Sequence, residues 1–408
     1  NYNTVVGDEA GTAITTGDQN TIVGHTAGDA LTVGGKNTVF GQQALSSDTQ
    51  GSKSVAIGEA ALYTQNFTTA TDAYNVAVGN DAGTAITTGT ENTLIGGLAG
   101  DAITTGVRNT ALGYKAVSSV TTGDFNTGVG RTALENVTTA DGNTAVGVAA
   151  GSQITTGANN TAMGYLALNL ITTGSGNTFI GASAGDSCTD TINCVAIGLN
   201  ALGGADADHS NVAVGQLALN VCTGNSNTAV GDQAGANVTS GVNNVFLGED
   251  AGRSGSPGGQ ITTASNTLVL GNGSIANAHI QVDWTVASDE RDKTDFTALD
   301  LGLDFVKELE PVTYKWDKRS KYGEDVSTIT HDGTHKEDWL DVGFKAQAVE
   351  ALEKAAGYTI ADKTNLTTNL SEDGKQYGLT YSKFVPILVK AVQELSTKLD
   401  TAVARIAE

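Results

Sequence analysis

The sequence predicts a mainly β protein, in which a parallel β-solenoid of 17-residue coils is followed by a small α/β domain ending in a coiled-coil helix. Three observations predict this class. A short motif recurs at fixed spacing through residues 1–271, the composition changes abruptly near residue 287, and the stretch 388–406 has the 4-3 apolar spacing of a coiled-coil seam.

The recurring motif is close to Asn-Thr-x-apolar-Gly. Twelve of its fifteen Gly-to-Gly spacings are 17 residues, with Gly at positions 7, 24, 41, 58, 79, 96, 113, 130, 147, 164, 181, 198, 215, 231, 248 and 271. Such a unit is too short for the helix pairs of helical solenoids, which need about 30 residues or more. β-branched residues between regularly spaced glycines favour short strands joined by tight turns.

Each unit therefore predicts one solenoid coil, with a strand at the motif, a turn, and a second strand near Ile-Thr-Thr. We expect the apolar residue before Gly to stack into an interior ladder and Gly to take corners with positive φ. Asn opens 13 of the 16 units, so stacking would align these amides in a structural ladder. Sixteen coils about 4.8 Å apart would form a rod of about 75 Å.

The change in composition predicts where the rod ends. Residues 1–287 hold 21 acidic, 6 basic and 45 Gly residues, whereas residues 288–408 hold 23, 16 and 7. We expect a rod at 1–271, a connector strand at 272–287 centred on the β-branched and aromatic run His279–Ala287, and a separate domain at 288–408. The chain begins with Asn1, so we also expect further protein upstream.

Composition also excludes several classes of function. The net charge of −22 leaves no basic stripe for nucleic acid. No apolar run reaches the ~20 residues of a membrane span, so no membrane insertion is expected. The three cysteines are too few for a disulfide framework and are expected to be buried free thiols. His331 and His335 lack completing ligands, so no metal or other cofactor is expected.

The C-terminal part carries its own structural signals. Residues 301–309 have helical apolar spacing and stop before Pro311, and Val312–Trp316 is a strand candidate. The closing segment predicts a coiled-coil helix whose seam consists of Leu388, Val392, Leu395, Leu399, Ala402 and Ile406. This seam is shorter than three full heptads, so we expect it to pack against copies of itself.

Four features stand in a fixed order here: Ser288-Asp289-Glu290-Arg291-Asp292-Lys293, the segment from Leu309 to Trp316, the Gly343–Gln347 motif and the closing helix. Together they resemble the intramolecular chaperone domain at the C-terminus of phage endosialidases, tail fibres and tailspikes. The resemblance implies a homotrimeric virion tail-fibre or tailspike segment for host attachment, assembled in the host cytoplasm. It implies as partners a host cell-surface glycan or protein receptor and other tail proteins.

The same resemblance implies self-cleavage at Ala287–Ser288. The hydroxyl of Ser288 would attack the carbonyl of Ala287, and Lys293 would be the base, a role that suits a desolvated lysine with a lowered pKa. Asp289, the third candidate catalytic residue, would orient the turn or a hydrogen-bond donor. The expected reaction is single-turnover hydrolysis of the chain's own peptide bond, without turnover of a separate substrate.

Receptor binding is expected where the coils are irregular. The insertion between Gly58 and Gly79 carries Tyr63, Phe67 and Tyr74, whose rings could stack on sugars, and these three are the candidate binding residues.

Two alternatives remain for the rod. Its repeats also resemble the head repeats of trimeric autotransporter adhesins, so a bacterial trimeric adhesin head is one alternative, which the charged closing helix disfavours. A polysaccharide-degrading tailspike is the other, and it would need paired carboxylates in a cleft. Close acidic pairs are few, Asp206/Asp208 and Glu249/Asp250 among them.

Overall fold

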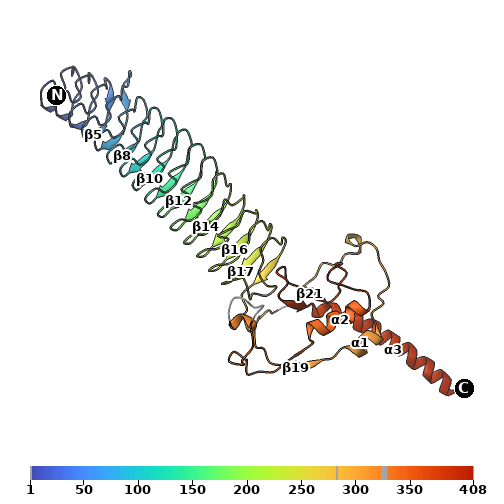
Figure 1. Cartoon of the computed structure of the whole chain (residues 1–408). Helices are drawn as coiled ribbons and strands as arrows, with labels where there is room; N and C mark the ends of the chain where they lie inside the picture. Colours follow the sequence, from blue (N-terminus) through green and yellow to red (C-terminus); the bar gives the residue numbers. More distant parts are fainter. Residues whose placement is uncertain (1, 282–283, 323–328, 408) are drawn as a thin grey trace. The chain divides into compact units, whose positions relative to one another are not determined.

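The computed structural model describes residues 2–281, 284–322 and 329–407. The chain divides into two compact units, Asn1–Ala251 with Thr262–Leu268, and Gly252–Ile261 with Val269–Glu408. The first unit is the predicted parallel β-solenoid of 17-residue coils (Figure 1). The second is a small α/β unit ending in a long helix. The predicted mainly β class, with its solenoid of 17-residue coils, small C-terminal unit and terminal helix, is confirmed, and the trimer stays a prediction.

Sixteen three-residue strands form one parallel sheet, in which each strand pairs with the strand of the next coil. Two further strands, β4 (Gly51–Ser52) and β6 (Thr71–Asp72), pair with each other at the inserted coil. The sixteen strands are β1 Thr4–Val6, β2 Thr21–Val23, β3 Thr38–Phe40, β5 Val55–Ile57, β7 Val76–Val78, β8 Thr93–Ile95, β9 Thr110–Leu112, β10 Thr127–Val129, β11 Thr144–Val146, β12 Thr161–Met163, β13 Thr178–Ile180, β14 Val195–Ile197, β15 Val212–Val214, β16 Thr228–Val230, β17 Val245–Leu247 and β18 Leu268–Leu270.

The expected interior ladder lies at a different position of the strand. The middle residue of the strand points inward, as at Ile22 and Leu94, which are fully buried. The apolar residue before Gly points outward, and Phe40 and Leu112 are 58% and 46% exposed. Successive side chains of a strand face opposite sides, so only one of the two can line the core. The prediction chose the wrong one, and an apolar column remains on the outer surface.

The expected second strand near Ile-Thr-Thr is also absent from most of the described coils, which bend there instead. The bend is held by Thr residues that stack from coil to coil. Thr104, for example, donates from its amide (2.9 Å) and from Oγ1 (3.0 Å) to the carbonyl of Thr121. The β-branched residues that suggested a strand therefore serve a column of turn contacts.

Gly is required at the end of each strand for two reasons. Gly96 has a φ of +133°, and a Cβ there would lie 2.5 Å from the carbonyl oxygen of Gly113 in the next coil. The Gly after the Thr bend is needed for space alone, since a Cβ at Gly106 would lie 2.6 Å from the carbonyl oxygen of Gly123. The expected positive φ is thus present at the strand end, while close stacking explains the second Gly.

The asparagine ladder is present and lies inside the solenoid. Asn126 Oδ1 accepts a hydrogen bond from the backbone N–H of Asn143 (3.1 Å), and its Nδ2 donates to the carbonyl of Ala140 (2.8 Å). The same pattern repeats along most of the rod, and Asn126 is fully buried. The ladder is therefore a structural element and not a recognition surface.

Part of the core is filled by complementary pairs of residues. A large residue at the middle of the strand is accompanied by Gly six residues later, as in Phe179 with Gly185. In several other coils a small residue is accompanied by Leu or Val, as in Ala196 with Leu202, and both of these are fully buried. Ala77, in contrast, is accompanied by Gly83, beside which the buried Ile86 lies. Leu202 adopts a φ of +50° and Gly185 one of +60°, so the two coils share one backbone conformation. Close packing at constant volume explains the exchange.

This pairing predicts that a double substitution recovers stability that each single substitution loses. Gly185→Leu is expected to destabilise the rod by about 1–3 kcal/mol, because a Cβ at Gly185 would lie 2.1 Å from a ring carbon of Phe179. Phe179→Ala alone leaves a cavity and is expected to cost about 3–5 kcal/mol. The double variant reproduces the Ala196/Leu202 pair and should recover most of both losses. Denaturation midpoints of the three variants measure this, and simple addition of the two single losses would contradict it.

The second unit is organised around its long C-terminal helix. Its elements are α1 Leu303–Glu308, β19 Val312–Tyr314, β20 Asp341–Gly343, α2 Ala346–Ala355, β21 Thr368–Leu370, β22 Tyr377–Leu379 and α3 Phe384–Ala407, with single 3-10 turns η1 Glu290–Asp292, η2 Arg319–Lys321 and η3 Tyr381–Lys383. β19 pairs with β20, and β21 with β22, both antiparallel. The core contains Leu301, Phe305, Val349, Phe384 and Ile387. The expected helix before Pro311 and the strand after it are both present.

Helix α3 has a packed side and an open side. Ile387 and Ala391 are buried, and Glu394 accepts a hydrogen bond from the amide of Leu303 at the start of α1 (2.8 Å). The predicted seam faces away, with Leu399 61% and Ile406 85% exposed. The closing helix is confirmed, and its assembly into a coiled coil stays a prediction.

A buried carboxylate predicts how the second unit responds to acid. Burial by itself would raise the pKa of Glu353, but hydrogen bonds from Thr368 and Thr367 outweigh burial and hold this pKa below its ordinary value. The stabilisation is therefore present above pH about 4.3 and is lost as the pH falls through the lowered pKa. Glu353→Gln is expected to lower the stability of the second unit at pH 7. It should also make that stability less dependent on pH in the acid range. Helical circular dichroism during denaturation at pH 7 and at a series of pH values below 4 tests it, and an unchanged acid response would contradict it.

The expected connector strand is not formed in residues 279–281 or 284–287, which are irregular and exposed; residues 282 and 283 lie outside the described part. Among the described residues, no helix combines the length and apolarity that crossing a membrane requires.

Candidate functional site

The junction between connector and second unit is shaped by a one-turn helix. Asp289 caps η1, and its Oδ1 accepts the amide of Arg291 (2.9 Å). The Arg291 guanidinium returns to the same carboxylate, with Nε 3.0 Å from Oδ1 and Nη2 2.5 Å from Oδ2. The amide of Lys293 donates to the carbonyl of Glu290 (3.1 Å), which closes the turn. The sequence folds this way because Asp is a favoured N-cap residue.

The turn brings Ser288 and Lys293 together. The Nζ of Lys293 lies 2.6 Å from the Oγ of Ser288 and 3.2 Å from the Ser288 carbonyl oxygen. A five-residue separation does not by itself predict contact, and the η1 turn supplies it. A hydroxyl held on an amine is the geometry of a serine nucleophile beside its base.

The surroundings of this pair are open. Residues 284–298 are all exposed in the single chain, so the expected desolvation of Lys293 is not provided here. Hydrogen bonding from Arg291 lowers the pKa of Asp289, which keeps this carboxylate charged and bound to its partner. Asp289 is thus placed to hold the turn rather than to accept the Ser288 proton.

Sequence reasoning assigned no role to Arg291. The available signal was its place two residues after a capping aspartate, where its side chain can bridge back to the cap. The fork of the guanidinium matches a carboxylate in two bonds, so Arg291 is a positioning residue for the turn.

The three aromatic residues proposed for binding do not form one surface. Phe67 is only 6% exposed, and its amide donates to the buried carboxylate of Asp48 (3.2 Å). Tyr63 and Tyr74 are 37% and 51% exposed, and Lys53 Nζ donates to the Tyr74 hydroxyl (2.7 Å). Phe67 therefore packs the inserted coil, and only the two tyrosines can meet a ligand.

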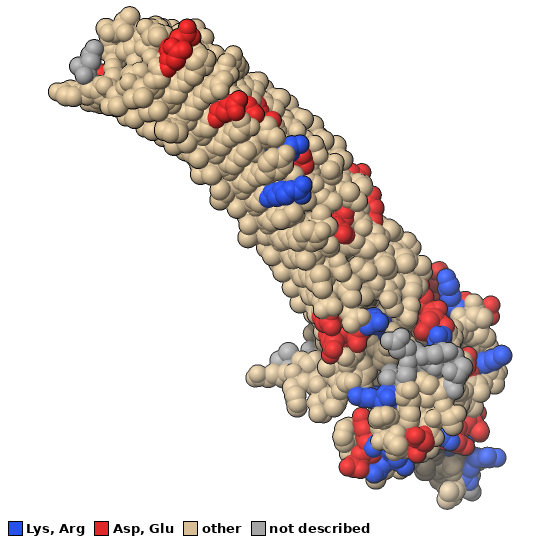
Figure 2. Space-filling view, turned by 60° about the vertical axis from the view of Figure 1, so that its left-hand side comes forward, with Lys and Arg blue, Asp and Glu red and all other residues tan. Residues whose placement is uncertain are grey.

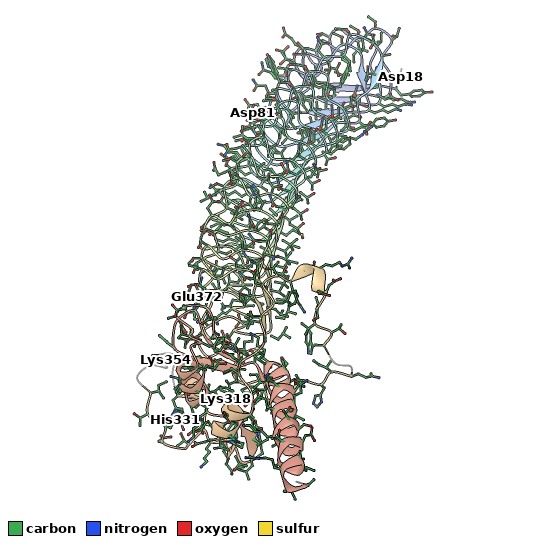
Figure 3. The ribbon with its side chains drawn as sticks, turned by 90° about the vertical axis from the view of Figure 1, so that its right-hand side faces the viewer. Asp18, Asp81, Lys318, His331, Lys354 and Glu372 are labelled. Atoms are coloured by element: carbon green, nitrogen blue, oxygen red, sulfur yellow. The ribbon has the colours of Figure 1, made fainter. Side chains whose placement is uncertain are left out.

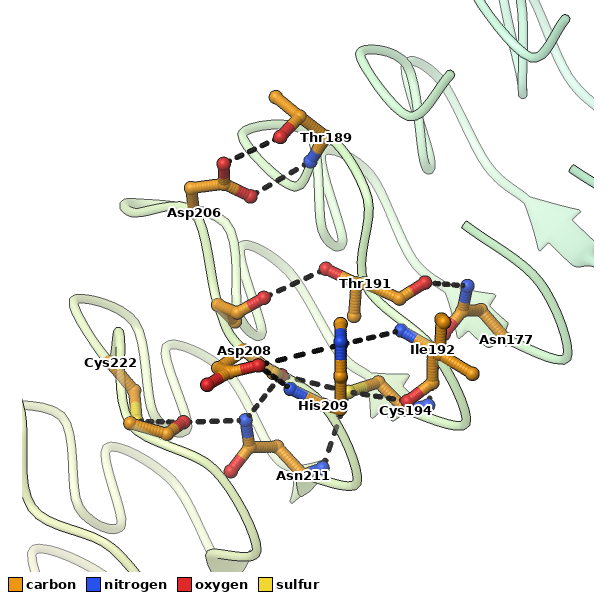
Figure 4. A network of polar contacts seen from close by, with 12 residues as sticks. Asn177, Thr189, Thr191, Ile192, Cys194, Asp206, Asp208, His209, Asn211 and Cys222 are labelled. Carbon is orange, nitrogen blue, oxygen red and sulfur yellow. Dashed lines mark hydrogen bonds and ion pairs between the residues drawn. The ribbon is translucent and has the colours of Figure 1, made fainter. Parts of the chain in front are cut away.

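The carboxylates of Asp206 and Asp208 bond to residues of the solenoid itself (Figure 4). Asp206 accepts hydrogen bonds from the amide (2.8 Å) and hydroxyl (2.6 Å) of Thr189 in the preceding coil. Asp208 accepts the amide of His209 (2.8 Å), and His209 Nδ1 accepts the amide of Ile192 (3.2 Å). These contacts are structural and do not indicate a glycosidase pair.

The three cysteines are buried and free, as expected. Cys194 replaces Asn in the ladder, and its Sγ accepts the amide of Asn211 (3.2 Å). Burial raises the pKa of Cys194 to about 12 and that of Cys222 to about 11, and it also raises the pKa of Cys188. Since the thiolate is the reactive form, all three are poor nucleophiles.

The two histidines considered for a metal flank an aromatic ring. The ring centres of His331 and His335 lie 5.6 Å and 4.7 Å from that of Tyr322, and His331 Nδ1 lies 3.4 Å from a carboxylate oxygen of Asp317. Figure 3 labels His331 and Lys318 in this part of the second unit. Within the described ranges, no group of three His, Cys, Asp or Glu side chains is placed to hold a metal ion.

Comparison with known families finds one match in this region. Residues 288–358 match the family model described as the chaperone of endosialidase. The match begins at Ser288, and it covers the η1 turn and the elements through α2. No curated protein is similar enough to this chain to count as a relative.

Proposed function

We propose that the chain is a segment of a virion tail fibre or tailspike that attaches to a host cell surface, and that residues 288–408 are a self-cleaving chaperone for its trimerisation. The observation that carries the proposal is the Lys293 Nζ–Ser288 Oγ contact of 2.6 Å at the first residue of the region similar to an endosialidase chaperone. The rod preceding it is the part that would be released.

The proposed reaction transfers and then hydrolyses one acyl group. Ser288 Oγ bonds to the carbonyl carbon of Ala287, and the peptide C–N bond breaks. Lys293, in its neutral form, accepts the hydroxyl proton, which passes to the departing nitrogen. Water then opens the ester, which leaves a carboxyl group on Ala287 and restores the hydroxyl of Ser288. No cofactor takes part, and each chain reacts once.

The fold gives a physical reason for a chaperone. Parallel coils depend on pairing between distant residues, which is slow, and an unfinished rod has open edges that invite aggregation. The exposed seam of α3 can align copies of the chain before their coils stack. Removal of this module afterwards would leave the rod kinetically trapped.

Host attachment is the part of this proposal that a binding experiment tests. The released rod, labelled with a fluorophore, is expected to bind cells of some bacterial strains and not others. Periodate treatment of the cells should abolish binding to a glycan receptor, and protease treatment binding to a protein receptor. Absence of binding across a broad panel would contradict attachment by this segment. Shortening of purified surface polysaccharide would instead support the polysaccharide-degrading alternative.

A further inference from the structure

The outer face of the solenoid sheet consists of two uncharged columns. The large sheet contains fifteen strands from β1 to β17, because β4 and β6 pair separately. In each of these fifteen, the first and third residues point outward. The first residue is Thr or Val in every case. The third residues are Val6, Val23, Phe40, Ile57, Val78, Ile95, Leu112, Val129, Val146, Met163, Ile180, Ile197, Val214, Val230 and Leu247, and none of them is buried. We call this face the apolar stripe.

The apolar stripe is unusual for a parallel sheet in water. Parallel sheets normally have both faces covered, and contiguous exposed apolar surface marks an interaction site. Eight of its fifteen third residues are exposed, with Met163 and Val230 at 40% each, and the other seven are half-buried. Charged residues are sparse on the side of the solenoid that Figure 2 shows. We therefore expect the stripe to be buried against a partner surface.

The regular spacing of the side chains along the stripe indicates which kind of partner can pack against it. Its side chains recur once per coil, and neighbouring strands lie about 4.8 Å apart. A partner that follows the stripe must present apolar groups with this same period over fifteen coils. Another copy of the same solenoid has this period at every position, whereas an ordinary globular surface does not.

We propose that the apolar stripe is the surface through which solenoids of neighbouring copies of this chain pack, parallel and in register. The exposed seam of α3, at the same end of every chain, imposes the parallel direction. The inference rests on the proposed self-association and assigns it a surface in the rod, which the endosialidase chaperone match at 288–358 does not cover.

Cross-linking at one stripe position tests this directly. The full-length chain carrying Met163→Cys is treated with a bismaleimide of about 10 Å span, the usual separation of packed sheets. The matched control is Thr156→Cys, which is exposed in the bend that precedes strand β12. The unmodified chain serves as the blank, because its cysteines are buried. We expect covalent multimers to form at least tenfold faster from Met163→Cys than from Thr156→Cys.

A second pair of variants tests the same surface without cross-linking. Leu112→Asp with Ile197→Asp places charge on the stripe, and Thr105→Asp with Thr173→Asp places it on the exposed bend. The first pair is expected to lower the melting temperature of the rod, and the second to leave it unchanged.

The outcomes separate the two proposals. The native mass of the chain shows whether it is a multimer. If it is, but cross-linking is equally fast at positions 163 and 156, or the two double Asp variants have equal melting temperatures, the assignment of the stripe is overturned and self-association stands. A mass of one chain would overturn both. Selective cross-linking at Met163→Cys in a multimer supports both.

Discussion

Ser288→Ala is expected to leave the chain uncut, whereas the wild-type chain separates into two pieces that meet between residues 287 and 288. The substitution removes the hydroxyl that Lys293 Nζ contacts at the junction, at 2.6 Å. Loss of a nucleophile that acts with its base costs roughly a factor of 10⁴ or more in rate. Intact mass of freshly expressed protein measures both pieces.

A second serine–lysine contact provides the control. Lys321 Nζ donates to Ser274 Oγ at 2.7 Å, so Ser274→Ala removes a comparable exposed contact in the same unit. Cleavage should continue in Ser274→Ala and stop in Lys293→Gln. An uncut wild-type chain, or cleavage that persists in Ser288→Ala, would reduce Ser288 and Lys293 to structural residues.

Asn126→Ala is expected to destabilise the rod by about 2–6 kcal/mol. The change leaves the buried amide of Asn143 and the carbonyl of Ala140 without their side-chain partners, which lie at 3.1 Å and 2.8 Å. An unsatisfied buried polar group costs about 1–3 kcal/mol, and two are created here. Denaturation followed by the β-sheet circular dichroism signal measures the loss.

The matched control is Asn80→Ala, at an exposed position of the same solenoid. Surface substitutions of this kind usually change stability by no more than about 0.5 kcal/mol. Equal midpoints for Asn126→Ala and Asn80→Ala would show that the ladder contributes little and that apolar packing alone holds the coils together.

Much of the molecule follows from sequence periodicity. A repeat of 17 residues stacks identical positions above one another, so a parallel solenoid, a Gly column and an Asn ladder could be predicted without coordinates. The closing helix and the strand after Pro311 could be predicted for the same reason, since each depends on local spacing. The proposed Ser288–Lys293 pair, by contrast, came from a family resemblance.

The errors arose where a decision depends on distant residues. Which residue of the strand faces inward could not be read from hydrophobicity, because Ile22 in the core and Phe40 on the surface are both apolar. Phe67 was expected on the surface, yet the buried acceptor Asp48, nineteen residues earlier, holds its amide. The role of Asp206 was likewise set by Thr189 in the coil stacked against it.

The sequence by itself therefore determined the architecture: a 17-residue β-solenoid, a charged α/β unit and a terminal helix with an apolar seam. Only the tertiary structure decided which columns are buried, that the Asn ladder is internal, and that the η1 turn brings Lys293 onto Ser288. The physical reason is that periodicity specifies which residues share a column. The side of the coil that a column faces depends on the volume enclosed and on the hydrogen-bond partners that neighbouring coils supply.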